Sequence, residues 1–90
     1  MTDTVENLIN EMTTAQTTGK RVEIHFDGEN LLLRDCFLLV SAEIDGDEIE
    51  LKSENRIINL CFTDVTYDAM EEYYILNCGS VNVYLFFHRV

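Results

Sequence analysis

Basic residues are scarce in this sequence, which has six lysines and arginines against 17 aspartates and glutamates in 90 residues and a formal net charge of −11. A surface this negative repels phosphate backbones and anionic membranes, which argues against direct binding to nucleic acid or to a membrane. It attracts basic grooves of the kind that hold nucleic acid. The charge therefore favours a protein partner with a basic surface.

Proline is absent, and no low-complexity tract or linker interrupts the chain. Ninety residues are too few to build two separate cores. The hydrophobic fraction of 47% is that of a globular chain and not of a disordered acidic tail. We therefore expect a single domain over residues 1–90.

Long apolar runs and export signals are also missing. No run approaches the ~20 residues that span a bilayer, and the chain does not begin with a basic segment followed by an apolar one. Cys36, Cys61 and Cys78 are an odd number at spacings that match no zinc or redox motif. Small buried thiols in a reducing compartment are the simplest interpretation, which predicts a cytoplasmic protein.

Catalytic and cofactor motifs are not found either. His25 and His88 lie in different predicted hairpins without a nucleophile or metal-ligand spacing, so we expect both to be ordinary strand residues. The acidic run 45–50 resembles a calcium loop only superficially, because Ile49 and Glu50 stand where an EF-hand needs an oxygen ligand and a glycine. We expect no enzyme activity, no cofactor and no metal.

Hydrophobic periodicity predicts one helix followed by strands. Over residues 3–18 apolar side chains recur three and four positions apart, and Gly19 is a natural helix end. After Gly19 the period changes to two, which is typical of half-buried strands. The predicted fold class is α+β: an N-terminal helix followed by a strongly bent antiparallel sheet or small open barrel of about six strands.

Turn residues divide the strand region into hairpins. Residues 27–30 form the first turn, with a loop of either two or four residues, and Arg34-Asp35 suggests a bulge in the strand that follows. Residues 56–62 form a strand, and 63–72 a connection that holds one short helical turn.

The second hairpin contains the candidate site. Taking Asp45-Gly46 as a two-residue turn places Glu43 opposite Glu48 and gathers the acidic side chains on one face. Five acids fall within eight residues here, and the two lysines of the chain do not balance them: Glu43, Asp45, Asp47, Glu48 and Glu50. They form either a solvated face that keeps a small protein soluble or a patch that imitates phosphates.

The last hairpin, residues 73–78 and 81–89 around Gly79-Ser80, is apolar on both faces. Either the helix covers one face and the curled sheet the other, or an aromatic face meets a partner or a second copy. Tyr67, or Tyr73 and Tyr84, are the candidate anchors for a partner.

In size, acidity, lack of catalytic residues and helix-plus-antiparallel-sheet pattern, the chain resembles small phage-encoded anti-defence proteins, such as anti-CRISPR proteins and uracil-DNA glycosylase inhibitors. The resemblance is one of composition and architecture over the whole chain, without a shared motif. It implies a non-enzymatic inhibitor in the host-cell cytoplasm, which captures the basic groove of a nucleic-acid-binding enzyme such as a defence nuclease.

The same order of elements is similar to small Sm-like barrels, which assemble through strand edges. This second resemblance implies an assembly module that forms a homodimer or larger homo-oligomer through its last hairpin.

Overall fold

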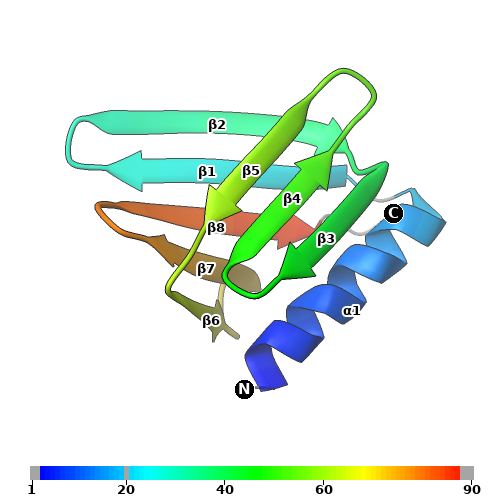
Figure 1. Ribbon diagram of the computed structural model, residues 1–90, viewed down its shortest axis with the longest axis horizontal. Helices are drawn as coiled ribbons and strands as arrows, with labels where there is room; N and C mark the ends of the chain where they lie inside the picture. Colours follow the sequence, from blue (N-terminus) through cyan, green and yellow to red (C-terminus); the bar gives the residue numbers. More distant parts are fainter. Residues whose placement is uncertain (1–2, 20, 88–90) are drawn as a thin grey trace.

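The computed structural model describes residues 3–19 and 21–87, which form one helix and eight strands (Figure 1). In chain order the elements are α1 (Asp3–Thr18), β1 (Arg21–Gly28), β2 (Leu31–Leu38), β3 (Ser41–Asp45), β4 (Glu48–Lys52), β5 (Ile57–Cys61), β6 (Asp64–Asp68), β7 (Tyr73–Cys78) and β8 (Val81–Phe87). The predicted α+β class and N-terminal helix are confirmed. The strands number eight and not about six.

The described strands form two antiparallel sheets that do not close into a barrel. The larger has five strands in the order β2-β1-β8-β7-β6, and the smaller has three in the order β3-β4-β5. The chain passes between the sheets at two corners, residues 39–40 and 62–63. At these corners the Val40 N–H donates to the Lys52 carbonyl at 2.8 Å, and the Thr63 N–H donates to the Asn77 carbonyl at 2.8 Å.

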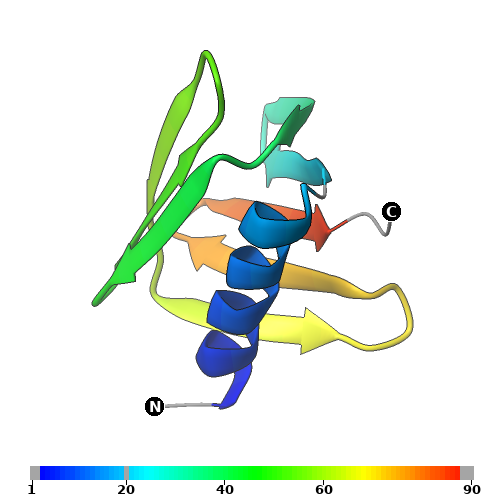
Figure 2. The same ribbon diagram turned by 90° about the vertical axis from the view of Figure 1, so that its right-hand side faces the viewer.

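The helix and the smaller sheet lie on the same side of the larger sheet (Figures 1 and 2). The helix contacts β3 of the smaller sheet and β6 of the larger one. The core lies between these three layers and includes Leu8 and Met12 of α1, Ile49 and Leu51 of β4, and Leu85 of β8. The expectation that the helix and the curled sheet cover opposite faces is wrong. No described element covers the outer face of the five-stranded sheet.

Strand β2 is regular where the sequence suggested a bulge. Its pairing with β1 runs without interruption from Gly28 opposite Leu31 to Arg21 opposite Leu38, which makes the loop two residues long. The predicted bulge at Arg34-Asp35 is wrong, because the chain instead changes direction at the corner 39–40, where it changes sheets.

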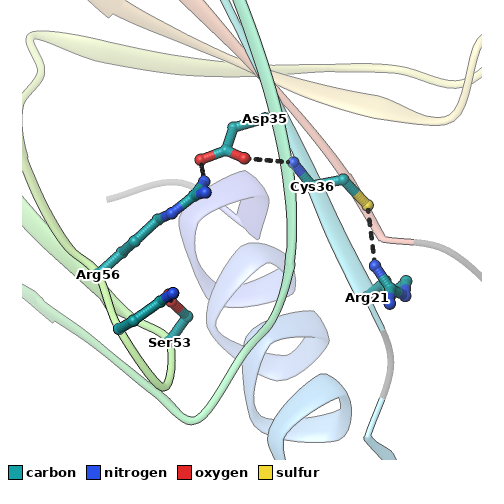
Figure 3. A network of polar contacts seen from close by, with 6 residues as sticks. Arg21, Asp35, Cys36, Ser53 and Arg56 are labelled. Atoms are coloured by element: carbon teal, nitrogen blue, oxygen red, sulfur yellow. Dashed lines mark hydrogen bonds and ion pairs between the residues drawn. The ribbon is translucent and has the colours of Figure 1, made fainter.

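Asp35 lies on the inner face of β2, directly opposite Ile24. Its carboxylate accepts a hydrogen bond from the Cys36 backbone N–H at 2.9 Å and forms an ion pair with Arg56, which precedes β5 (Figure 3). These contacts stabilise the Asp35 carboxylate, which faces the core. They also connect β2, an edge strand of the larger sheet, to the residues before β5, an edge strand of the smaller one.

The hairpin β3–β4 turns one residue later than predicted. Gly46 and Asp47 form the turn, so that Ile44 lies opposite Ile49 and Glu43 lies opposite Glu50, not Glu48. Gly46 has a φ of 62°, which suits the first turn position of a type II′ hairpin. The predicted register is therefore wrong by two residues on one strand, but a shift of two preserves the face on which each side chain lies.

The segment 63–72 contains β6 and not only a connection with a helical turn. β6 pairs with β7, and β8 pairs with both β7 and β1, so neither strand of the last hairpin is a sheet edge. The prediction that the last hairpin supplies a free edge for assembly is therefore wrong. Its turn at Gly79-Ser80 is confirmed by the pairing of Cys78 with Val81. His88 and Arg89 lie outside the described residues.

Within the described ranges, no helix is both long enough and apolar enough to cross a membrane.

Candidate functional site

The outer face of β3 and β4 carries four carboxylates, which we call the acidic ladder: Glu43, Asp45, Glu48 and Glu50. Glu43 lies directly opposite Glu50, and Asp45 directly opposite Glu48. Residues paired in this way have Cβ atoms about 4.5–5.5 Å apart, so each pair sets two negative charges side by side. The alternation of apolar and acidic residues produces this arrangement, because the apolar partners Ile44 and Ile49 turn inward.

The ladder lines a shallow hollow of about 430 Å³ with part of β5. Asn59 extends the row of Glu50, and Cys61 extends the row of Glu48, with its Sγ 3.9 Å from Glu48 Oε1. In the described chain, the one ion pair at the ladder joins Lys52 Nζ to Glu50 Oε1 at 3.4 Å. The surface therefore stays strongly negative.

Asp47 lies beside the ladder at the tip of the hairpin. Its backbone carbonyl accepts a hydrogen bond from the Phe62 N–H at 2.8 Å, which ties the turn to the corner of the chain. The structure thus brings the five predicted acids together, four on one face and Asp47 at its end.

The predicted tyrosine anchors lie elsewhere. Tyr67 of β6 is 46% exposed and contacts Tyr74 with ring centroids 4.8 Å apart, beside the helix residue Glu11. Tyr73 and Tyr84 lie on the outer face of the five-stranded sheet. The structure therefore does not join these tyrosines to the acidic ladder.

Burial dominates the clear pKa shifts. It raises the pKa of Tyr74 to about 12, with Glu11 and Tyr67 adding to the effect. Burial also raises the pKa of the Cys78 thiol, and Cys61 adds to it. A raised thiol pKa keeps the sulfur protonated and makes it a poor nucleophile.

The cysteines are less buried than predicted, and all three are free. Cys36 and Cys61 are exposed because each lies on the outer face of its sheet, whereas Cys78 is half-buried. In residues 3–19 and 21–87, no group of three histidine, cysteine or acidic side chains is placed to hold a metal ion. His25 pairs with Glu23 and packs against Phe86, with ring centroids 4.9 Å apart.

A second hollow, which sequence reasoning missed, lies between β1, β2 and the start of β5. It has a volume of about 420 Å³ and includes Phe26, Leu33 and Ile58, with Arg56 and Asp35 at its border. The signal available was the run of leucines at residues 31–33, of which Leu32 and Leu33 are exposed.

No family model matches the chain, and neither curated proteins nor solved structures give a match.

Proposed function

We propose that this protein is a non-enzymatic inhibitor that binds the basic surface of a nucleic-acid-binding enzyme, such as a defence nuclease, in the cytoplasm. The acidic ladder is the contact surface, and its carboxylates occupy the positions that phosphates take in the enzyme's groove. The binding is electrostatic in origin, so it is fast and weakens with salt.

The observation that carries this proposal is the pairing of like charges across β3 and β4. Directly opposed acids destabilise a hairpin, by up to about 1 kcal/mol for each pair. A surface kept only for solubility mixes charges of both signs. Two such pairs on one face, with a single described lysine beside them, favour a surface that is used for binding.

The experiment compares two variants with the same net charge. The ladder variant combines Glu43→Gln, Asp45→Asn, Glu48→Gln and Glu50→Gln. The control variant removes four exposed acids elsewhere by Glu6→Gln, Asp27→Asn, Glu29→Gln and Glu54→Gln. Each protein is immobilised and incubated with a bacterial lysate at low salt, and bound proteins are eluted with duplex DNA.

We expect the wild-type protein and the control variant to retain a nucleic-acid enzyme that DNA displaces, and the ladder variant to lose it. Addition of the wild-type protein should then inhibit DNA binding by that purified enzyme. Equal loss in both variants would assign the effect to net charge alone. Full retention by the ladder variant, or no enzyme that DNA displaces, would exclude the proposal.

A further inference from the structure

The outer face of the five-stranded sheet carries a continuous group of rings, which we call the aromatic cluster: Tyr73, Tyr84 and Phe86. The Tyr73 ring meets those of Tyr84 and Phe86 edge to face, with centroids 5.1 and 5.0 Å apart. The helix and the smaller sheet lie on the opposite side (Figure 1). The three rings are half-buried, His25 packs against Phe86, and no described element covers the cluster.

Carboxylates adjoin the cluster on the side of β6. Asp68 lies directly opposite Tyr73 where β6 pairs with β7, and Asp64 lies on the same face of β6. Burial raises the pKa of the Tyr73 hydroxyl, and the charges of Asp68 and Glu71 add to the rise. The negative field of these carboxylates therefore reaches the ring.

The two described arginines of this face lie on neither of the strands that carry the cluster, although β1 is the direct neighbour of β8. Arg21 belongs to β1 and Arg34 to the edge strand β2, whereas the cluster lies on β7 and β8. The half of the face formed by β6, β7 and β8 thus combines exposed ring surface with negative charge.

We propose that this half of the face binds an arginine side chain from a cationic segment of a partner protein. A guanidinium stacks on aromatic rings through its planar face and donates hydrogen bonds to a carboxylate at its edge. Tyr73 and Tyr84 supply the rings, and Asp68 supplies the carboxylate beside them. A second copy of this chain fits less well, because it carries the same carboxylates on this face and a net charge of −11.

This surface is separate from the acidic ladder. The outer faces of two packed sheets point away from each other, and the ladder belongs to the smaller sheet. Binding at the aromatic cluster therefore does not depend on the function proposed above, and variants separate the two surfaces.

The test titrates the full-length protein with an acetylated peptide of alternating arginine and glycine, and with the matched lysine peptide. Backbone amide chemical shifts in NMR spectra locate each peptide. We expect shifts over β7 and β8, and tighter binding of the arginine peptide at equal charge. Tyr73→Leu with Tyr84→Leu should weaken arginine binding about tenfold, while Tyr73→Phe with Tyr84→Phe should retain it.

The ladder variant should keep the shifts over β7 and β8. If the leucine variant does not fold, Asp64→Asn with Asp68→Asn provides a second test, because it removes both charges and leaves every ring in place. That variant should bind the arginine peptide several-fold more weakly than the wild-type protein does.

Three results would overturn the proposal. Equal affinity for the arginine and lysine peptides would reduce the binding to net charge. Shifts confined to β3 and β4 would place the peptide on the acidic ladder. A dimer seen by light scattering, present in the wild-type protein and lost in the leucine variant, would show that a second copy is the occupant.

Discussion

Tyr74 shows how burial and charge combine at a single side chain. It is 5% exposed, and its ring meets those of Tyr67 and Phe87 with centroids 4.8 and 6.1 Å apart. Burial, with Glu11 and Tyr67 nearby, raises its pKa to about 12. The ionised hydroxyl is therefore much less favourable in the folded protein than in the unfolded chain.

This pKa predicts a loss of stability at alkaline pH. A tyrosine titrates near pH 10 when unfolded, so the contribution of Tyr74 is fully present below about pH 10 and is lost as the pH rises toward 12. Ultraviolet absorbance of tyrosinate should show a late-titrating group that Tyr74→Phe removes. An unchanged late phase in that variant would assign it to another tyrosine, and urea unfolding across the same pH range measures the loss.

At the scale of elements, the sheet edge at β2 depends on Asp35. An inward-pointing charge on an edge strand is one way in which proteins discourage pairing with a further strand. Here the Asp35 carboxylate also accepts a hydrogen bond from the Cys36 backbone N–H, and it forms an ion pair with Arg56, which precedes β5 of the other sheet. One side chain therefore satisfies a backbone donor and connects two edges.

Replacing Asp35 should cost more than replacing its cationic partner. Arg56→Ala removes a partly exposed ion pair, which is worth up to about 1 kcal/mol. Asp35→Ala removes the ion pair and a hydrogen bond, and should lower the free energy of unfolding by about 1–2 kcal/mol. Urea denaturation checks the order, and equal losses would mean that the hydrogen bond to Cys36 contributes nothing.

The acidic hairpin predicts a conflict between stability and binding. Asp45→Lys places a lysine opposite Glu48, so the cross-strand repulsion becomes attraction, and the free energy of unfolding should rise by about 0.2–1 kcal/mol. The same variant should bind the proposed enzyme partner more weakly. Thermal unfolding measures the first effect, and a variant that is less stable than the wild type would contradict the observed register.

Local pattern predicted the elements better than their pairing. The spacing of Leu8, Met12 and Ala15 marked the helix, and it ends where Gly19 allows. Alternation alone does not determine the register of β3–β4, because a turn at Asp45-Gly46 and a turn at Gly46-Asp47 both keep the acids on one face. β6 was missed although Val65 and Tyr67 alternate with polar residues, because its acids favoured a surface connection.

At the scale of the whole molecule, a net charge of −11 should make salt act in opposite directions on folding and binding. Raising the ionic strength from about 0.01 to 1 M shortens the screening length from about 30 to 3 Å. Repulsion among carboxylates is then weaker, so the free energy of unfolding should rise, while affinity for a basic partner should fall. Urea midpoints and binding measured at both salt concentrations test this, and parallel changes would contradict it.

The sequence predicts one part of the candidate site, the acidic hairpin, and not its relation to the tyrosines. The five acids from residues 43 to 50 share one hairpin, so their proximity is local and readable from the sequence. The relation of Tyr67, Tyr73 and Tyr84 to that hairpin depends on which sheet each strand joins and which side the helix covers. Those are tertiary facts, and alternation along a strand does not determine them.

The position of β8 has a consequence for how this protein is made. β8 lies in the middle of the larger sheet and is the only described strand that joins β1 to β7, with Val22 paired to Phe87. Until residues 81–87 have been synthesised, no strand pairs with both the early hairpin β1–β2 and the later hairpin β6–β7 to hold them in one sheet. A nascent chain that stalls before this point should remain open to proteases, and the fold should form only after translation has passed it.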